Sequence, residues 1–309
     1  MRIGVDVGGT KIEVALIDTK GVIVTRQRIA TPKNDYHAAL KEIAALTLQI
    51  EAKSGASCTV GMGIPGAISP ATGKVKNAPN APFDGHQFDK DMEALLQRPV
   101  RMMNDANCFA LSEATDGAAA GAQIVFGVIL GTGCGGGIVI NGVPLVGANA
   151  VSGEWGHNPL PWAHEEERPG PHCGCGKFGC IETYLSGTGF EARHFETTGQ
   201  KISAEIISAN AADGDATCLV SLAQYESRLA RALASVINVL DPNIIVLGGG
   251  MSNIGRLYQN IPKLWSQWVF SDQVSTRLVA PQFGDSSGVR GAAWLWPAGA
   301  GAVSTLEPR

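Results

Sequence analysis

Two segments of this sequence, about 125 residues apart, share one pattern, and this repeat limits the fold more than any other feature. Each copy has an apolar strand, a turn containing Gly and Thr, a second strand, another turn and a third strand. The first copy runs from residue 3 to 28 and the second from 124 to 146. The repeat predicts two related α/β halves that face each other across a cleft.

The rest of the chain supplies helices and single strands to these halves. The predicted helices cover residues 36–53, 89–97, 106–114 and 219–240, and the predicted single strands cover 59–64, 100–103 and 244–247. We place the boundary near residue 118, so that residues 1–118 form an N-terminal domain and residues 119–288 a C-terminal domain.

Composition excludes several classes of protein. There are 24 Lys and Arg against 28 Asp and Glu, and the net charge of −4 offers no basic field for a nucleic-acid backbone. The start of the chain lacks the pattern of a signal peptide, and the longest apolar stretch, 124–130, is too short to cross a bilayer. We expect a cytoplasmic protein whose partners include neither nucleic acid nor membrane.

The seven cysteines favour a metal site over disulfides. Their number is odd, and Cys173, Cys175 and Cys180 lie within eight positions. Three thiolates and one imidazole form a closed tetrahedral set for a structural Zn²⁺. From spacing alone His157, His164 and His172 are rival fourth ligands, and buried or redox-active cysteines are the alternative.

The first Gly-rich turn resembles a phosphate-binding loop between two strands. Gly8 and Gly9 let backbone N–H groups approach phosphate oxygens, Thr10 adds a hydroxyl and Lys11 adds positive charge. Asp6 can hold Mg²⁺. The turn matches neither the Walker A nor the Rossmann motif, and an ordinary Gly-rich hairpin is the alternative.

A second loop repeats this arrangement, and a third Gly run follows a later strand. The second loop and the start of its next strand contain Gly131, Thr132, Gly133, Cys134 and Gly135. The third run, with Gly249 and Gly250, would let a nucleotide base or ribose lie against bare backbone. A plain strand-to-helix turn is the alternative for this run.

Asn104 and Asp105 stand between a predicted strand and a predicted helix, where open α/β sheets place ligand-binding residues. Phosphoryl transfer to a hydroxyl group needs one carboxylate that accepts the alcohol proton, and Asp105 is the candidate base. The alternative is that either residue only caps the following helix.

Polar residues flank the cysteine cluster. Glu154, His157 and Glu182 can bind the hydroxyl groups of a polyol, although isolated glutamates are more often solvated surface residues. The acidic run 165–167 precedes a Pro-Gly-Pro turn and is typical of an exposed loop.

Seven motifs together resemble the ROK (repressor, ORF, kinase) sugar kinases, and the resemblance covers essentially the whole chain. They are Asp6–Lys11, Gly61–Gly66, Asn104–Asn107, Leu130–Gly133, Gly153–His157, Cys173–Cys180 and Leu247–Gly250. The resemblance implies an actin-like ATPase fold of two α/β domains with ATP and sugar in the cleft. It also implies a C-terminal helix at about residues 289–299 that packs back on the first domain, and it favours a homodimer.

The resemblance also assigns roles to residues. It implies that Asp105 is the base, that the backbone of Gly66 approaches the sugar, and that Asn104, Glu154, His157 and Glu182 hold it. The family's histidine serves metal and sugar through its two ring nitrogens, which selects His157 over His172.

Within the family, the segments 156–162 and 284–296 look most like bacterial fructokinases of the mannokinase type. We therefore expect ATP-dependent phosphorylation of a free hexose at its 6-hydroxyl, with D-fructose as the main substrate and N-acetylglucosamine as the alternative. A sugar-responsive transcription regulator of the same family is the alternative from another class. Such regulators add an N-terminal helix-turn-helix segment, whereas the first strand here starts at Ile3, so we favour the kinase.

Overall fold

Two five-stranded sheets organise the chain, and the computed structural model describes residues 1–32, 35–78 and 81–297. The first sheet, in the order β3-β2-β1-β4-β7, contains β1 (Arg2–Val7), β2 (Lys11–Ile17), β3 (Ile23–Ala30), β4 (Thr59–Ile64) and β7 (Val100–Asn104). The second, in the order β10-β9-β8-β11-β12, contains β8 (Ile124–Leu130), β9 (Cys134–Ile140), β10 (Val143–Pro144), β11 (Ile244–Gly248) and β12 (Arg277–Val279).

The two sheets have the same topology. In each, the first three strands form an antiparallel meander, and the two later strands run parallel to the first strand of the meander. The internal repeat predicted from the sequence is therefore confirmed. Outside the two five-stranded sheets, β5 (Ala67–Ile68) and β6 (Val75–Lys76) form a small hairpin that is not expected from the sequence pattern.

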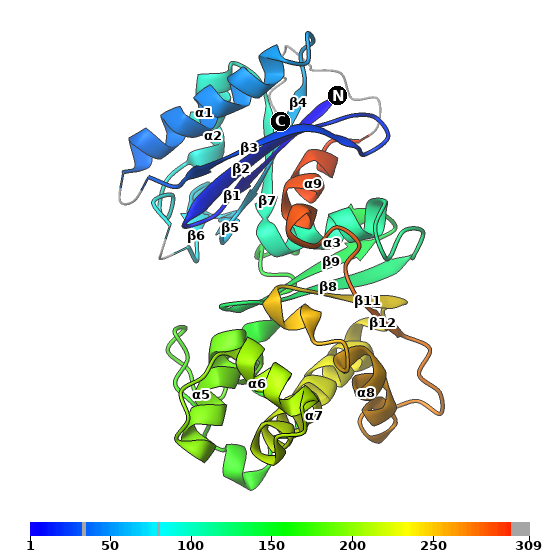
Figure 1. Cartoon of the computed structure of the whole chain (residues 1–309). Helices are drawn as coiled ribbons and strands as arrows, with labels where there is room; N and C mark the ends of the chain where they lie inside the picture. Colours follow the sequence, from blue (N-terminus) through cyan, green and yellow to red (C-terminus); the bar gives the residue numbers. More distant parts are fainter. Residues whose placement is uncertain (33–34, 79–80, 298–309) are drawn as a thin grey trace.

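Two helices, α3 (Asp105–Thr115) and α9 (Ser287–Trp294), lie between the sheets (Figure 1). α9 contacts β1 and β4, whereas α3 contacts β8 and β9. The backbones approach closely, since a Cβ atom at Gly4 would lie 1.9 Å from the Val289 oxygen and one at Gly291 would lie 1.6 Å from the Cys108 oxygen. The buried carboxylate of Glu113 accepts a hydrogen bond from Ser287 Oγ at 2.7 Å and so joins the two helices.

The outer faces of the sheets are covered by the remaining helices (Figure 1). α1 (Tyr36–Ala52) and α2 (Phe88–Leu96) pack on the first sheet, where alternate residues of β1 point toward them and into a core with Ile43 and Met62. The helices beside the second sheet are α4 (Glu182–Leu185), α5 (Gly187–Thr198), α6 (Ala204–Ala212), α7 (Ala216–Leu240) and α8 (Leu257–Leu264). Short 3-10 helices are η1 (Trp155–His157), η2 (Glu165–Glu167), η3 (Gly250–Asn253), η4 (Trp265–Gln267) and η5 (Gly284–Ser286).

The acidic run 165–167 is not simply an exposed loop, and this prediction is wrong for Glu167. Glu165 and Glu166 are exposed, but Glu167 is buried in η2. Its carboxylate accepts hydrogen bonds from Arg228 and Arg231 on α7, each at 2.8 Å. Burial alone would raise the pKa of Glu167, but the bonds from the two arginines and from the His164 N–H lower it to about 2.

The chain passes from the first sheet to the second between Asn104 and Ile124, by way of α3. The predicted boundary near residue 118 falls in this stretch and stays a prediction. Residues 298 and 299 of the predicted C-terminal helix lie outside the described residues. Among the residues that the structure describes, no helix is both long and apolar enough to cross a membrane.

Candidate active site

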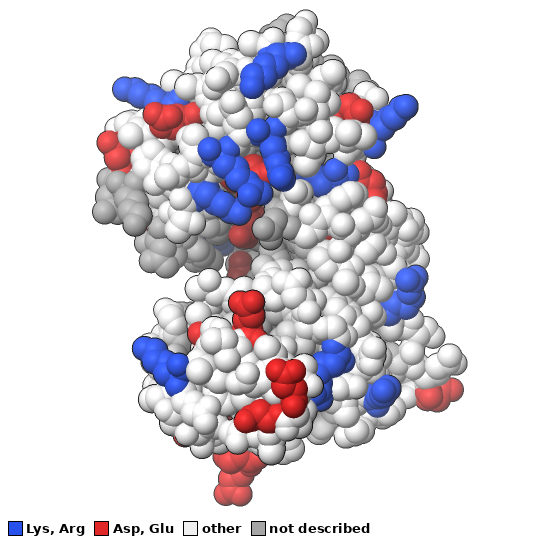
Figure 2. Space-filling model, viewed as in Figure 1, with Lys and Arg blue, Asp and Glu red and all other residues white. Residues whose placement is uncertain are grey.

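The carboxyl ends of the parallel strands carry most of the predicted site residues. β1, β4 and β7 run in one direction, so the first Gly-rich loop, Gly66 and the Asn104–Asp105 pair lie along one edge of the first sheet. β8 and β11 are also parallel, which brings the second loop near Gly249. Figure 2 shows a hollow between the two halves of the molecule, with acidic side chains inside it.

Asn104 and Asp105 lie where β7 ends and α3 begins. Asn104 is the N-cap of α3, because its side-chain oxygen accepts a hydrogen bond from the Ala106 N–H at 2.9 Å. Its amide donates to the carbonyl oxygen of Gly66 at 3.1 Å. Asn104 therefore does cap the helix, as one alternative from the sequence expects. This cap fixes the backbone from which Asp105 projects.

The surroundings of Asp105 shift the pKa of its carboxyl group upward. Solvent reaches its side chain, yet the surrounding protein removes enough water to raise the pKa of the carboxyl group. A hydrogen bond from the Ala106 N–H at 2.8 Å opposes this shift, and the negative charge of Glu154 adds to it. A carboxylate whose pKa is raised toward the working pH is a better general base than one with an ordinary pKa.

Asp6 precedes the first Gly-rich loop and belongs to the same cluster of acidic groups. Burial, followed by the negative charges of Asp105 and Glu13, raises the pKa of Asp6 to about 6, although Lys11 and Arg28 oppose the shift. Carboxylate oxygens in such an electronegative position are the ligands that Mg²⁺ prefers, so the residues present fit this ion.

The first loop is a tight turn whose outer residues face solvent. The Gly8 N–H donates to the Lys11 oxygen at 2.9 Å, and Thr31 Oγ1 donates to the Gly8 oxygen at 2.7 Å. Gly9, Thr10 and Lys11 are exposed. The loop joins β1 to β2, so it is the strand–loop–strand turn that the sequence predicts.

The second loop has the open backbone that a phosphate group requires. The Gly131 N–H donates to the Gly133 oxygen at 3.0 Å, and no atom would lie within 4 Å of a Cβ atom at Gly131 or Gly250. Gly249 has φ +76° and packs against the Leu130 oxygen, which would lie 2.4 Å from a Cβ atom there. The third Gly run therefore lies beside the strand that leads into the second loop, with Gly250 beginning the 3-10 helix η3.

Cys134 and Gly135 lie in β9, directly after this loop. The Cys134 side chain is buried, and its N–H donates to Glu182 Oε2 at 2.9 Å. Gly135 faces Ala106 of α3, whose Cβ atom would lie 3.3 Å from a Cβ atom at Gly135. The N–H groups of Cys134 and Gly131 thus both have partners inside the protein, and the predicted phosphate contacts of this loop, Cys134 and Gly135 included, stay predictions.

Glu154 directly precedes η1 and His157 is its last residue, and this short helix is held against β9. The buried Trp155 donates its indole N–H to the Gly135 oxygen at 3.0 Å, and a Cβ atom at Gly156 would lie 2.1 Å from the Cys134 oxygen. The side chains of Glu154 and His157 are both half-buried. Two close contacts thus fix the turn that carries the predicted sugar ligands Glu154 and His157.

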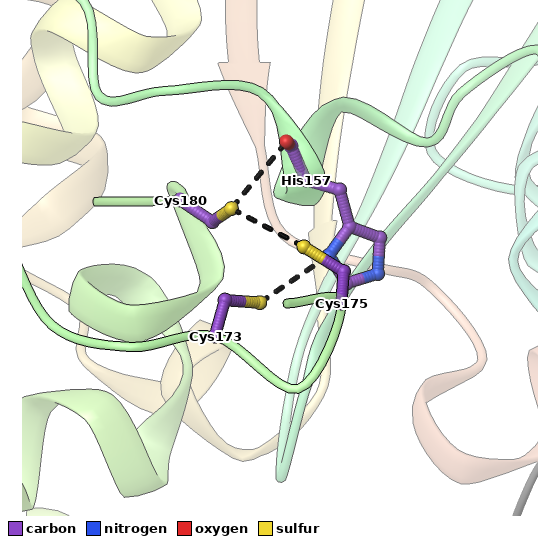
Figure 3. Close-up of side chains that lie close together, drawn as sticks. All are labelled: His157, Cys173, Cys175 and Cys180. Carbon is purple, nitrogen blue, oxygen red and sulfur yellow. Dashed lines mark hydrogen bonds between the residues drawn. The ribbon is translucent and has the colours of Figure 1, made fainter. Parts of the chain in front are cut away.

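His157, Cys173, Cys175 and Cys180 form the cluster that the sequence predicts, with their ligand atoms all within 4.8 Å of one another (Figure 3). His157 Nδ1 lies 3.6 Å from Cys173 Sγ, and the sulfur atoms of Cys175 and Cys180 are also 3.6 Å apart. Tetrahedral Zn²⁺ holds such ligand atoms about 3.6 to 3.8 Å apart, so the four residues fit this ion.

The rival histidines do not belong to this cluster. His172 is exposed and packs edge-on against Phe178, and His164 is the N-cap of η2. Because His157 Nδ1 faces the sulfur atoms, its Nε2 is left for another partner.

Comparisons with known proteins agree with this arrangement. Residues 2–298 match the model of the ROK family. N-acetyl-D-glucosamine kinases from Aliivibrio salmonicida and Vibrio cholerae are 42% and 40% identical to this chain, each over 96% of it and 99% of the relative. A ROK hexokinase structure from Thermus thermophilus has a TM-score of 0.84 at 28% identity, over 94% of this chain and 96% of that one.

A further solved structure is a ROK family glucokinase from Streptomyces griseus in complex with glucose and AMPPNP. Its TM-score is 0.77 at 30% identity, and the match covers 95% of this chain and 98% of that chain. The chain belongs to the ROK family and, within it, to the sugar kinases. The predicted actin-like ATPase fold of two α/β domains is confirmed.

The expectation of a fructokinase is wrong. Curated relatives at about 40% identity along almost the whole chain are N-acetyl-D-glucosamine kinases, the alternative expected from the sequence. The error has a physical reason: one pocket contact changes discrimination between sugars by only about 1 to 3 kcal/mol, and short segments such as 156–162 do not reveal which hydroxyl groups the folded pocket meets.

Proposed function

We propose that this protein is an N-acetyl-D-glucosamine kinase, which transfers the γ-phosphoryl group of ATP to the 6-hydroxyl of the sugar. The observation that carries the proposal is the 42% identity to such a kinase over 96% of this chain and 99% of the relative. The geometry at the end of β7 supports it, because it supplies a base beside predicted sugar ligands.

In this proposal Asp105 accepts the proton of the attacking hydroxyl group. Asn104, Glu154, His157 and Glu182 bind the other polar groups of the sugar, and the backbone at Gly66 approaches it. The hydrogen bond between Asn104 and Gly66 supports a shared position for these two residues. Placement of the hydroxyl group and neutralisation of phosphate charge together supply most of the rate enhancement, since phosphoryl transfer requires little covalent chemistry from the protein.

The two Gly-rich loops would hold the phosphates of ATP. Gly8, Gly9, Thr10 and Lys11 belong to the first loop, Gly131, Thr132 and Gly133 to the second, and Gly249 and Gly250 border the nucleotide. Asp6 would hold Mg²⁺, which supplies neutralisation of phosphate charge when bound. The raised pKa of Asp6, caused by burial and nearby acidic groups, supports a cation at this position.

A structural Zn²⁺ would be held by His157, Cys173, Cys175 and Cys180. The separations of 3.6 Å between their ligand atoms support this assignment. A closed set of four protein ligands stabilises the local fold and leaves no position for a reacting water. The homodimer expected from the family resemblance stays a prediction.

The test is ADP release by purified protein with Mg²⁺ and ATP, on a panel of N-acetylglucosamine, glucose, mannose and fructose. We expect kcat/KM for N-acetylglucosamine to exceed that for each other sugar by about tenfold or more. A higher kcat/KM for any unacetylated sugar contradicts the proposal. Phosphorus NMR of the product tests the 6-position separately.

A further inference from the structure

The junction between α4 and α5 reaches the second Gly-rich loop through consecutive contacts. The Gly187 N–H donates to the Gly131 oxygen at 2.7 Å, and Thr188 Oγ1 donates to the Thr132 oxygen at 2.8 Å. Both acceptors are backbone carbonyls of the loop that we assign to ATP. The position of this loop therefore depends on residues about 55 positions further along the chain.

Glu182, at the start of α4, adds a third contact to the same loop. Its Oε2 accepts a hydrogen bond from the Cys134 N–H at 2.9 Å and would lie 2.8 Å from a Cβ atom at Gly133. Its Oε1 points elsewhere and lies 3.9 Å from Cys173 Sγ. The two oxygens of one carboxylate thus face the nucleotide loop and the cysteine cluster.

The same short segment is anchored beside the predicted sugar ligands. The Ile181 N–H donates to the Asn158 oxygen at 2.9 Å, and Asn158 directly follows His157. Cys180 Sγ lies 3.5 Å from the His157 carbonyl oxygen. A sugar held by His157 and Glu182 would consequently contact the start of the segment that supports the nucleotide loop, whereas the loop itself is bonded to the end of the segment at Gly187 and Thr188.

We propose that the segment 181–188 couples the two substrate sites, with Glu182 as the positioning residue, so that a bound sugar raises the affinity for the nucleotide. The proposal rests on the sugar-binding role given to Glu182 under the proposed function. Without sugar, the half-buried Glu182 accepts a hydrogen bond from the Cys134 N–H at 2.9 Å on Oε2, whereas Oε1 accepts only a long contact of 3.9 Å from Cys173 Sγ. A sugar hydroxyl that donates to Oε1 fixes the carboxylate, and with it the Cys134 N–H and the loop, before the nucleotide arrives.

Thermodynamic linkage makes this coupling measurable from either side. The factor by which the sugar tightens nucleotide binding must equal the factor by which the nucleotide tightens sugar binding. Calorimetric titrations of AMPPNP with Mg²⁺, with and without saturating N-acetylglucosamine, give the factor directly. We expect it to be about fivefold or more in the unchanged protein.

Thr188→Val tests the segment without touching a predicted sugar ligand. The exposed Thr188 side chain tolerates this change, but the loop loses its hydroxyl donor. We expect the coupling factor to fall by at least half, while Thr188→Ser, which keeps the hydroxyl, retains it. A merely structural role would instead weaken AMPPNP equally with and without sugar, and that result overturns the proposal.

Glu182→Gln tests the positioning residue itself. A glutamine oxygen can still accept from the Cys134 N–H, whereas its NH₂ group cannot accept from a sugar hydroxyl. We expect the ratio of AMPPNP affinities with saturating sugar and without sugar to fall to about one. If sugar increases AMPPNP affinity in both Glu182→Gln and Thr188→Val by the same factor as in the unchanged protein, the proposal is overturned.

The coupling and the proposed function fail in different ways. If N-acetylglucosamine neither binds nor turns over, the proposed function is wrong, and the titrations are repeated with the hexose that the panel identifies. Independent affinities for that hexose and AMPPNP in the unchanged protein then overturn the coupling.

Discussion

The side-chain amide of Asn104 donates a hydrogen bond to the carbonyl oxygen of Gly66, with 3.1 Å between Nδ2 and O. Because the Asn104 oxygen also caps α3, a single side chain fixes the end of β7, the start of α3 and the loop after β4. The neighbouring Asp105 therefore projects from a backbone held on both sides. A general base needs such a fixed position, since small displacements of the reacting groups are costly.

Asp105→Asn removes the proposed base but keeps the shape of the side chain. We expect kcat to fall by about 10² to 10⁴-fold, because the amide of asparagine cannot accept the proton of the sugar hydroxyl as the proposed base does. Sugar binding, measured by calorimetry, remains detectable. Retention of the kcat of the unchanged protein shows that Asp105 is not the base.

Cys175→Ser tests the metal cluster. We expect loss of bound zinc together with a lower melting temperature, because metal binding and local folding are coupled. Elemental analysis and calorimetry measure the two effects. His172→Ala is the matched control, since the exposed His172 was a rival ligand and lies outside the cluster. Unchanged zinc content in Cys175→Ser contradicts the assignment.

Local patterns in the sequence were sufficient for much of the fold and the site. Three features depend only on residues close together in sequence: the repeated meander, the Asn104–Asp105 junction and the grouping of three cysteines. Apolar–polar alternation and turn residues reveal such local features directly. Selection of His157 among three histidines required the family resemblance, because spacing alone did not distinguish them. The structure then brought His157 to the cysteines.

Contacts between distant segments could not be predicted in this way. Glu167 resembles its exposed neighbours in sequence, and only the folded chain shows it between Arg228 and Arg231. The sequence of α7 gave no signal either, because the neighbours of the two arginines at helical spacing, Ser221, Gln224 and Ser235, are also polar. The bond between Glu182 and the Cys134 N–H gave no such signal, because it joins a half-buried side chain to a backbone group.

Glu167→Gln should destabilise the protein at neutral pH by about 3 to 5 kcal/mol, since it leaves the buried Arg231 without its charged partner. Thermal or urea unfolding measures the change. Glu166→Gln is the matched control, because Glu166 is adjacent but exposed. Equal stability of the two variants shows that the ion pair contributes no more than a surface glutamate.

The lowered pKa of Glu167 predicts how the stability of the protein changes in acid. Its pKa in the folded protein, about 2, is below the ordinary 4.5, so its contribution to stability is present above pH 4.5 and is lost as the pH falls toward 2. The difference in stability between the unchanged protein and Glu167→Gln should therefore shrink as the pH falls below about 4.5. A difference that stays constant down to the lowest pH at which the protein is folded contradicts the assignment.

The raised pKa of Asp6 predicts that stability depends on pH in the opposite direction. Its pKa is about 6 in the folded protein against an ordinary 3.8, so the stability it contributes is full below pH 3.8 and is lost as the pH rises through 6. Without Mg²⁺, Asp6→Asn should thus be more stable than the unchanged protein at pH 8 by roughly 1 to 3 kcal/mol, and the gain should shrink toward pH 4. Urea unfolding at several pH values measures this, with Asp213→Asn as an exposed control. If Asp6→Asn is instead less stable than the unchanged protein at pH 8, the ionised carboxylate of Asp6 is stabilised by partners within the protein. The electrostatic argument for a cation at this position then fails.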